Sequence, residues 1–208
     1  MDERPAGIGL RRPFRQRLGA WVPVLAIAAL AVLIALGGDL GRDALRYERD
    51  ALMAGEAWRL ITGHLVHLGW GHLWMNLAAL GLIRLLVADA FSAADWVAAA
   101  VVSALGIDLG LYVLAPGVDW YVGLSGVLHG LIAAAALVLL RTQPTFGALL
   151  GGGLLVKLLL EQTAGPLPFS ESAAGGEVIT EAHLYGAAAG AAYGALRSTS
   201  RRSAPAPL

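Results

Sequence analysis

The feature that most constrains this chain is a series of six apolar segments that contain few charged residues. A helix of roughly 20 mainly apolar residues is long enough to cross a lipid bilayer, and in lipid its backbone groups must be paired within the segment. The segments cover residues 21–36, 72–87, 96–114, 124–140, 145–160 and 182–196. The sequence therefore predicts an all-α polytopic membrane protein, with a bundle of six transmembrane helices formed by residues 20–197.

The composition excludes several other classes of protein. Only 14% of the residues are charged, whereas soluble domains contain about 25%. Basic and acidic residues are equal in number, 15 of each, so nothing indicates a nucleic-acid partner. The chain has no cysteine, which excludes disulfides and zinc sites built on thiolates.

The arginines predict the orientation in the membrane. Five arginines lie in residues 1–19, Arg84 and Arg141 fall at segment ends of the same side, and three more lie at the C-terminal end, from Arg197 onward. Because basic loops stay in the cytoplasm, we expect the basic segments 1–19 and 198–208 to be cytoplasmic. The first apolar segment could also be a signal peptide cleaved near Gly37–Gly38; we favour an uncleaved helix.

A few strongly polar residues interrupt the apolar segments. Burying such groups in lipid is costly, so each is a functional candidate. The set comprises His72 and Asn76, Asp108, Ser125 and His129, Lys157, and His183.

Small residues predict that the fourth and sixth segments pack closely. Gly186, Gly190 and Gly194 recur every four residues behind His183, and the fourth segment has a matching face of Ser125 or Gly126, Gly130, and Ala133 or Ala134. Such faces let helix backbones approach each other. The contact would bring the Ser125 hydroxyl to the His183 imidazole, a nucleophile and general base. Alone, Ser125 could equally be a helix cap or a small packing residue.

His72 and Asn76 lie one helical turn apart and so project from one face. Together with the Ser125 backbone N–H they could donate hydrogen bonds to an oxyanion. The alternative is an interhelical hydrogen bond that only holds the bundle together.

Taken in order, four short motifs resemble the rhomboid family of intramembrane serine proteases. They are Trp58-Arg59, the group His67, His72 and Asn76, the Gly-x-Ser-Gly of Gly123 to Gly126, and the Ala-His-x-x-Gly-x-x-x-Gly of Ala182 to Gly190. The resemblance implies a rhomboid-like bundle with a Ser125–His183 dyad that has no third acidic residue, and oxyanion donors from His72, Asn76 and Ser125. It implies supporting roles for Gly123, Gly126 and His67, and packing roles for Trp58, Arg59, Gly186 and Gly190. His129 departs from the family pattern, because many rhomboids have an aromatic residue there that stacks on the catalytic histidine; we expect His129 to support the site as well.

The chain most resembles the rhombosortases within that family, on residues 63–72 and on Leu128-His129-Gly130. This resemblance implies a bacterial inner-membrane enzyme without metal or cofactor, with its site open to the periplasm. Its partners would be single-pass anchored proteins in the lipid bilayer that end in a Gly-Gly, hydrophobic and basic anchor tail. The sequence does not specify the oligomeric state.

Several alternatives remain at this stage. His129 could pack on the catalytic histidine, donate a hydrogen bond, or compete as the base, and Asp108 and Lys157 could pair across helices or act separately. The run Gly151 to Gly153 could loosen a lateral gate or form a packing face. An inactive rhomboid that binds membrane segments is one rival function. A metal or haem protein is another, using the histidines at positions 64, 67, 72, 129 and 183.

Overall fold

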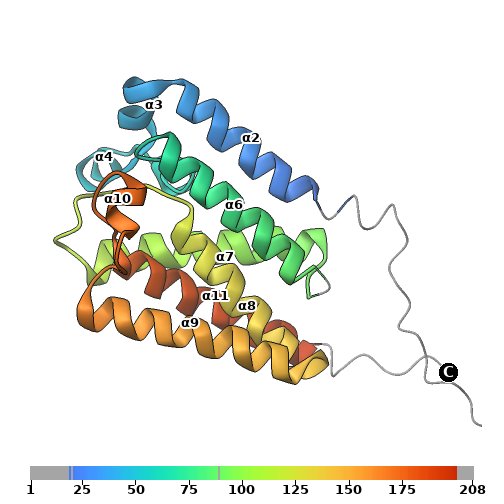
Figure 1. Ribbon diagram of the computed structural model, residues 1–208. Coiled ribbons are helices and arrows are strands. Elements are labelled where there is room, and N and C mark those ends of the chain that lie inside the picture. The colour runs from blue at the N-terminus through green and yellow to red at the C-terminus, as the bar shows by residue number, and fades with distance from the viewer. Residues whose placement is uncertain (1–18, 20, 89, 201–208) are drawn as a thin grey trace, which may run out of the picture.

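The computed structural model describes residue 19 and residues 21–88 and 90–200 as a bundle of helices (Figure 1). The six longest helices are α2 (Val22–Leu36), α6 (Trp70–Leu86), α7 (Ala93–Leu114), α8 (Ser125–Thr142), α9 (Pro144–Ala164) and α11 (Thr180–Ser200). Shorter elements connect them: α3 (Gly38–Leu45), β1 (Tyr47–Glu48), α4 (Arg49–Met53), α5 (Arg59–Thr62), β2 (Trp120–Tyr121) and α10 (Ser170–Ala174). Most of the predicted basic segments 1–19 and 198–208 lies outside the described residues.

Each of the six predicted apolar segments is helical, and the all-α fold class is confirmed. In the described part of the chain, three helices are long and apolar enough to span a membrane: α7, α8 and α9. A fourth span results if α2 and α3, which meet at a bend of 118°, are counted as one. Because α6 has 17 residues and α11 is less apolar, a total of six crossings remains a prediction.

Helix α8 is the centre of the bundle, between α6 and α9 in Figure 1. In its most apolar window 67% of the residues are buried, compared with 17% in α9. The large side chains of α9 instead face outward, with Leu149, Val156 and Leu159 more than half exposed. Exposed leucines over so much of a helix are expected where the surroundings are lipid rather than water.

The predicted small-residue contact between α8 and α11 is confirmed. A Cβ added at Gly186 would meet the Gly126 carbonyl oxygen, one at Gly190 would meet the Gly130 carbonyl oxygen, and one at Gly194 would lie 2.6 Å from the Ala134 carbonyl oxygen. The backbones therefore touch along three successive turns. This contact, called here the glycine seam, fixes the separation of the first turns of the two helices.

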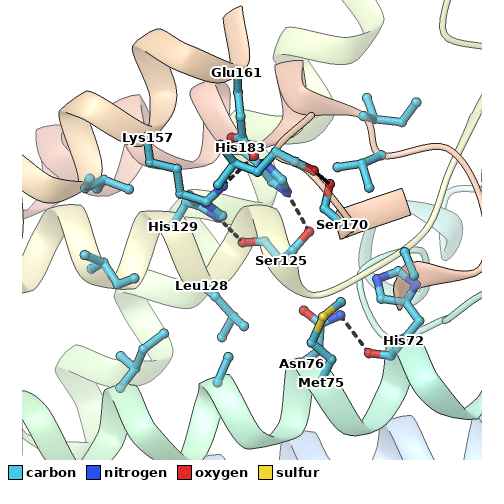
Figure 2. A pocket seen from close by; sticks show the side chains of 18 of the residues that line it. His72, Met75, Asn76, Ser125, Leu128, His129, Lys157, Glu161, Ser170 and His183 are labelled. Atoms are coloured by element: carbon cyan, nitrogen blue, oxygen red, sulfur yellow. Dashed lines mark hydrogen bonds and ion pairs between the residues drawn. The ribbon is translucent and has the colours of Figure 1, made fainter. Parts of the chain in front are cut away.

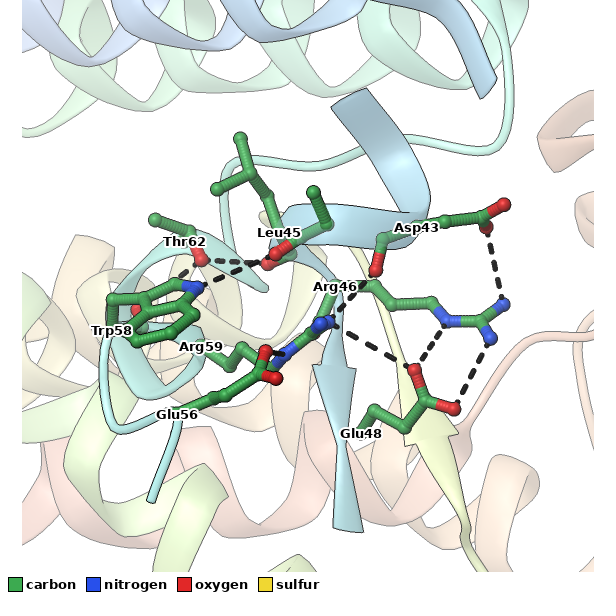
Figure 3. Close-up of polar contacts among 9 residues, drawn as sticks. Asp43, Leu45, Arg46, Glu48, Glu56, Trp58, Arg59 and Thr62 are labelled. Atoms are coloured by element: carbon green, nitrogen blue, oxygen red, sulfur yellow. Dashed lines mark hydrogen bonds and ion pairs between the residues drawn. The ribbon is translucent and has the colours of Figure 1, made fainter. Parts of the chain in front are cut away.

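Arg59 organises the connection between α2 and α6 (Figure 3). Its side chain is buried, and one guanidinium nitrogen donates to the carbonyl oxygens of Asp43 and Arg46, both at 2.8 Å. The Nε atom donates to the Glu56 carboxylate at 2.7 Å. A buried guanidinium with satisfied donors holds the end of α3 against the segment from Glu56 to Arg59. Trp58 beside it is half exposed and donates to the Ala44 carbonyl oxygen.

This connection is attached directly to the segment that precedes α8. Strand β1 pairs antiparallel with β2, placing Tyr47 opposite Tyr121, and the Gly123 N–H donates to the Gly63 carbonyl oxygen at 3.1 Å. Gly63 has no room for a side chain, since an added Cβ would lie 2.7 Å from the Tyr47 nitrogen. The connection between α2 and α6 thus positions the Gly123–Gly126 turn.

Asp108 and Lys157 do not pair with each other. Asp108 on α7 contacts the His64 imidazole at 3.2 Å, and both side chains are buried. Lys157 instead binds a carboxylate on its own helix, Glu161, at 2.5 Å. Of the two alternatives that the sequence left open, the structure favours separate roles, because each residue has a partner of opposite charge or polarity nearby.

Candidate active site

Ser125 and His183 meet at one end of the glycine seam (Figure 2). The serine is the first residue of α8, the histidine lies in the first turn of α11, and the Ser125 Oγ atom is 2.9 Å from His183 Nε2. This is within the distance required between a nucleophile and its general base. The predicted proximity of the two side chains is confirmed, and their catalytic roles are taken up below.

Ser125 does not act as a helix cap. Helix α8 has Leu124 at its N-cap position, without a side-chain capping bond, so the hydroxyl is left for His183. The turn before it depends on Gly123, whose φ of +121° is a conformation that side chains with a Cβ rarely adopt. The N–H of Ser125, in the first turn, has no helical acceptor four residues earlier and can donate elsewhere.

A third group, Glu161 on α9, completes the line of hydrogen bonds. Its Oε2 atom accepts from His183 Nδ1 at 2.9 Å, and the carboxylate is buried. The resemblance to the family did not imply an acidic partner for the histidine, and the structure places this carboxylate against it. The helix is also longer than the predicted apolar segment 145–160. Helix α9 continues to Ala164, because the Glu161 charge is satisfied inside the bundle and need not end the helix.

His129 packs on His183, which is one of the alternatives that the sequence left open. Its ring stacks on that of His183, with centroids 4.1 Å apart and planes 14° apart. Its Nδ1 donates to the Ser125 carbonyl oxygen at 2.7 Å. The Ser125 hydroxyl contacts His183, so the geometry favours packing and hydrogen bonding over a role for His129 as the base.

His72 lies opposite the serine on α6. Its Nδ1 accepts from the Leu68 N–H, so its Nε2 carries the proton and is a donor. A Cβ placed on Gly123 would be 3.1 Å from His72 Nε2 and 4.0 Å from Ser125 Oγ, which shows that both atoms border the same space. Asn76 donates one amide N–H to the His72 carbonyl oxygen at 3.0 Å, and the same nitrogen carries a second N–H.

His67 supports His72 from the preceding loop. The two rings meet edge to face, with centroids 4.9 Å apart, and His67 Nδ1 donates to the Leu65 carbonyl oxygen. Burial, and then the neighbouring His72 imidazole, lower the pKa of His67 to about 4.

This lowered pKa predicts a loss of stability in mild acid. The unfolded chain takes up a proton near pH 6.5 and the folded one only near pH 4, so the stabilisation is complete above pH 6.5 and is lost as the pH falls towards 4. The expected slope is up to about 1.4 kcal/mol per pH unit. Unfolding of wild type and His67→Gln in detergent at pH 7, 6 and 5 measures it. A stability difference between the two proteins that does not change with pH would refute this expectation.

Ser125 and His183 border a cavity of about 540 Å³. Its polar end also includes His72, Asn76 and Glu161, and its apolar walls come from the facing sides of α6 and α9 and from Ala174, Val178 and Ile179. On α6 these walls include Met75 and Ile83, and on α9 Leu149 and Leu154. The hydroxyl therefore faces a cavity that lies between α6 and α9.

The donor atoms of His129, Glu161 and His183 lie within 4.8 Å of one another, which makes them the candidate metal ligands among the described residues. The lone pairs of an imidazole lie in its plane, and these two rings are almost parallel and stacked, so their lone pairs do not converge on one point. His183 also uses both nitrogens, for Ser125 and Glu161. The arrangement fits proton transfer better than metal binding.

Comparison with known proteins agrees with this geometry. The chain matches the Rhomboid domain over residues 54–200, a range that contains Trp58, Arg59, and every residue of the site described above. No curated protein matches the chain significantly. The domain match covers well over half of the chain, and the protein therefore belongs to the rhomboid family, a family of intramembrane proteases.

Proposed function

We propose that this protein is an active serine endopeptidase that cleaves the transmembrane anchor of membrane-tethered proteins. The observation that carries the proposal is the 2.9 Å contact between Ser125 Oγ and His183 Nε2 at the wall of the cavity. Ser125 attacks the scissile carbonyl, and His183 accepts its proton and later gives it to the leaving amine. Water then hydrolyses the acyl-enzyme.

The oxyanion is held by donors on two elements. His72 Nε2 borders the same space as the serine hydroxyl, and Asn76 lies one turn further along α6 beside the cavity. The Ser125 backbone N–H, at the start of α8, adds the positive end of a helix dipole. Each such donor contributes about 3 kcal/mol when it is aligned with developing charge.

We propose an anchor helix as the substrate, because the cavity is apolar and is walled by the facing sides of α6 and α9. The helix enters between them, with the Gly151 to Gly153 run of α9 allowing movement, and unwinds at small residues to expose its carbonyl. A C-terminal Gly-Gly, hydrophobic and basic tail, as in rhombosortase substrates, has these properties. The enzyme would then lie in the bacterial inner membrane, with cytoplasmic termini and a site open to the periplasm.

Co-expression with a reporter tests this substrate class. A secreted reporter carrying a Gly-Gly anchor tail is expected to be released from the membrane by the wild-type protein and not by Ser125→Ala. A matched reporter with Leu-Leu in place of Gly-Gly is expected to remain anchored. Equal release of the two reporters would exclude the Gly-Gly preference, and equal release by Ser125→Ala would exclude the protease function itself.

A further inference from the structure

The rhomboid match and the Ser125–His183 contact do not explain the buried carboxylate of Glu161, which lies beside His183. Glu161 stands in the last turn of α9 with a side chain 2% exposed. Each of its oxygens has a partner: Oε2 accepts from His183 Nδ1 at 2.9 Å, and Oε1 accepts from Lys157 Nζ at 2.5 Å. Figure 2 shows Lys157, Glu161, His183 and Ser125 in continuous contact.

The Lys157 ammonium makes an ionised carboxylate tolerable at this position. A buried carboxylate is costly unless it is paired and hydrogen-bonded, and Lys157 lies four residues before Glu161 on the same helix, where side chains meet. The ammonium is about one-third exposed, so it can keep some contact with water while it neutralises the carboxylate.

The carboxylate determines which nitrogen of His183 carries the proton. An ionised carboxylate only accepts hydrogen bonds, so the neutral imidazole must hold its proton on Nδ1. Its Nε2 lone pair then faces Ser125 Oγ at 2.9 Å, which is the form a general base requires. Without an acceptor at Nδ1, the ring could equally hold its proton on Nε2 and be unable to accept the serine proton.

We propose that Glu161 is a positioning residue that turns the Ser125–His183 pair into a Ser–His–Glu triad; this inference rests on the proposed function. As the serine oxygen bonds to the scissile carbon, the carbonyl π electrons move to its oxygen and the hydroxyl proton moves to His183 Nε2. The imidazolium that results lies against the Glu161 carboxylate. Nε2 then returns the proton to the leaving nitrogen as the C–N bond breaks, and Glu161 exchanges no proton.

The other charged and titratable groups facing His183 cannot substitute for Glu161. His129 of α8 stacks on the ring, and His72 of α6 faces it across the cavity. Lys157 of α9 is a cation on the far side of the carboxylate. None of these carries negative charge. Glu177 also lines the cavity, but within the described part of the chain the carboxylate that contacts the His183 ring is that of Glu161, so Glu161 is the group placed to stabilise the imidazolium.

Glu161→Gln tests the proposal, since an amide fits the same space but can donate to Nδ1 and favour the wrong tautomer. We expect kcat to fall by about 10²–10⁴-fold, as for an acid-to-amide change in soluble triads, with KM changed less than threefold. Any remaining activity should show the acid limb of kcat/KM at lower pH, because the imidazolium has lost its counter-charge. Glu161→Asp, which keeps the charge, should retain more activity than Glu161→Gln.

Two controls separate this proposal from a purely structural role and from failure of the proposed function. Glu181→Gln makes the same chemical change at the start of α11, outside the cavity lining, and should leave kcat and the pH profile unchanged. In the wild-type protein, nitrogen-15 NMR of labelled histidine should find the resting His183 proton on Nδ1, a readout that needs no variant.

A proton on Nε2 would overturn the triad, as would a folded Glu161→Gln protein with wild-type kcat and pH profile. If Ser125→Ala and His183→Ala are inactive in that same case, the protease function stands and only the role of Glu161 fails. If Ser125→Ala cleaves as the wild type does, the proposed function itself fails.

Discussion

Replacing Ser125 with alanine is expected to lower kcat by about 10⁴-fold or more, and replacing His183 with alanine by a similar factor. Residues that act as one unit in acyl transfer are strongly non-additive. The double variant should therefore be no less active than either single variant. This follows from the 2.9 Å contact between the two side chains, because neither group can complete the proton transfer without the other.

Cleavage of a purified anchored substrate, followed over time, measures these rates. Ser172→Ala is a suitable control, because that exposed hydroxyl contacts only its own turn, at the Phe169 carbonyl oxygen. Its rate should equal that of the wild type. A Ser125→Ala protein within tenfold of wild-type activity, or single variants whose effects multiply in the double variant, would contradict the account.

Gly190→Ala is expected to destabilise the bundle and remove most activity, although it adds a single methyl group. In a free helix the change would be favourable by about 1 kcal/mol. Here the methyl group would meet the Gly130 backbone across the seam, and backbone cannot rotate away as a side chain can. Overpacking of this kind costs about 1–3 kcal/mol.

Gly190→Ala should lower kcat by more than its loss of folding stability alone would explain. Forcing α11 away from α8 lengthens the contact between Ser125 and His183, and a displacement of about 1 Å can lower a rate by about 10²-fold. Gly81→Ala is the matched control, because a Cβ on Gly81 in α6 has nothing within 4 Å and Gly81 does not line the cavity. Thermal unfolding and kcat of both variants measure the two effects; equal behaviour would mean that the seam does not set the active-site distance.

The sequence was sufficient to predict the helices and the serine–histidine contact. Long apolar segments leave the backbone few choices in a membrane, so the six helices lie within a few residues of their predicted positions. The glycines of α11, spaced by four residues, predicted that Ser125 and His183 meet, because only one face of each helix could approach so closely.

The position of Glu161 and the structure of the connection between α2 and α6 could not be predicted from the sequence, for different reasons. Glu161 follows the last leucine of the apolar segment 145–160 and lay outside that predicted helix, although its spacing of four from Lys157 was a signal of continued helix. The connection from α3 to α5 consists of helices of four to eight residues, which have no apolar run of their own. Their arrangement depends on tertiary contacts such as those of Arg59 with distant carbonyl oxygens.

Labelling by a fluorophosphonate, which reacts with activated serine hydroxyls, tests the central claim most directly. The purified wild-type protein should gain one adduct, which peptide mass spectrometry should locate on Ser125. The His183→Ala protein should gain none in the same time, because its serine has no base. An adduct on another residue, no adduct on the wild-type protein, or equal labelling of Ser125 in His183→Ala would show that the two side chains do not form a catalytic pair.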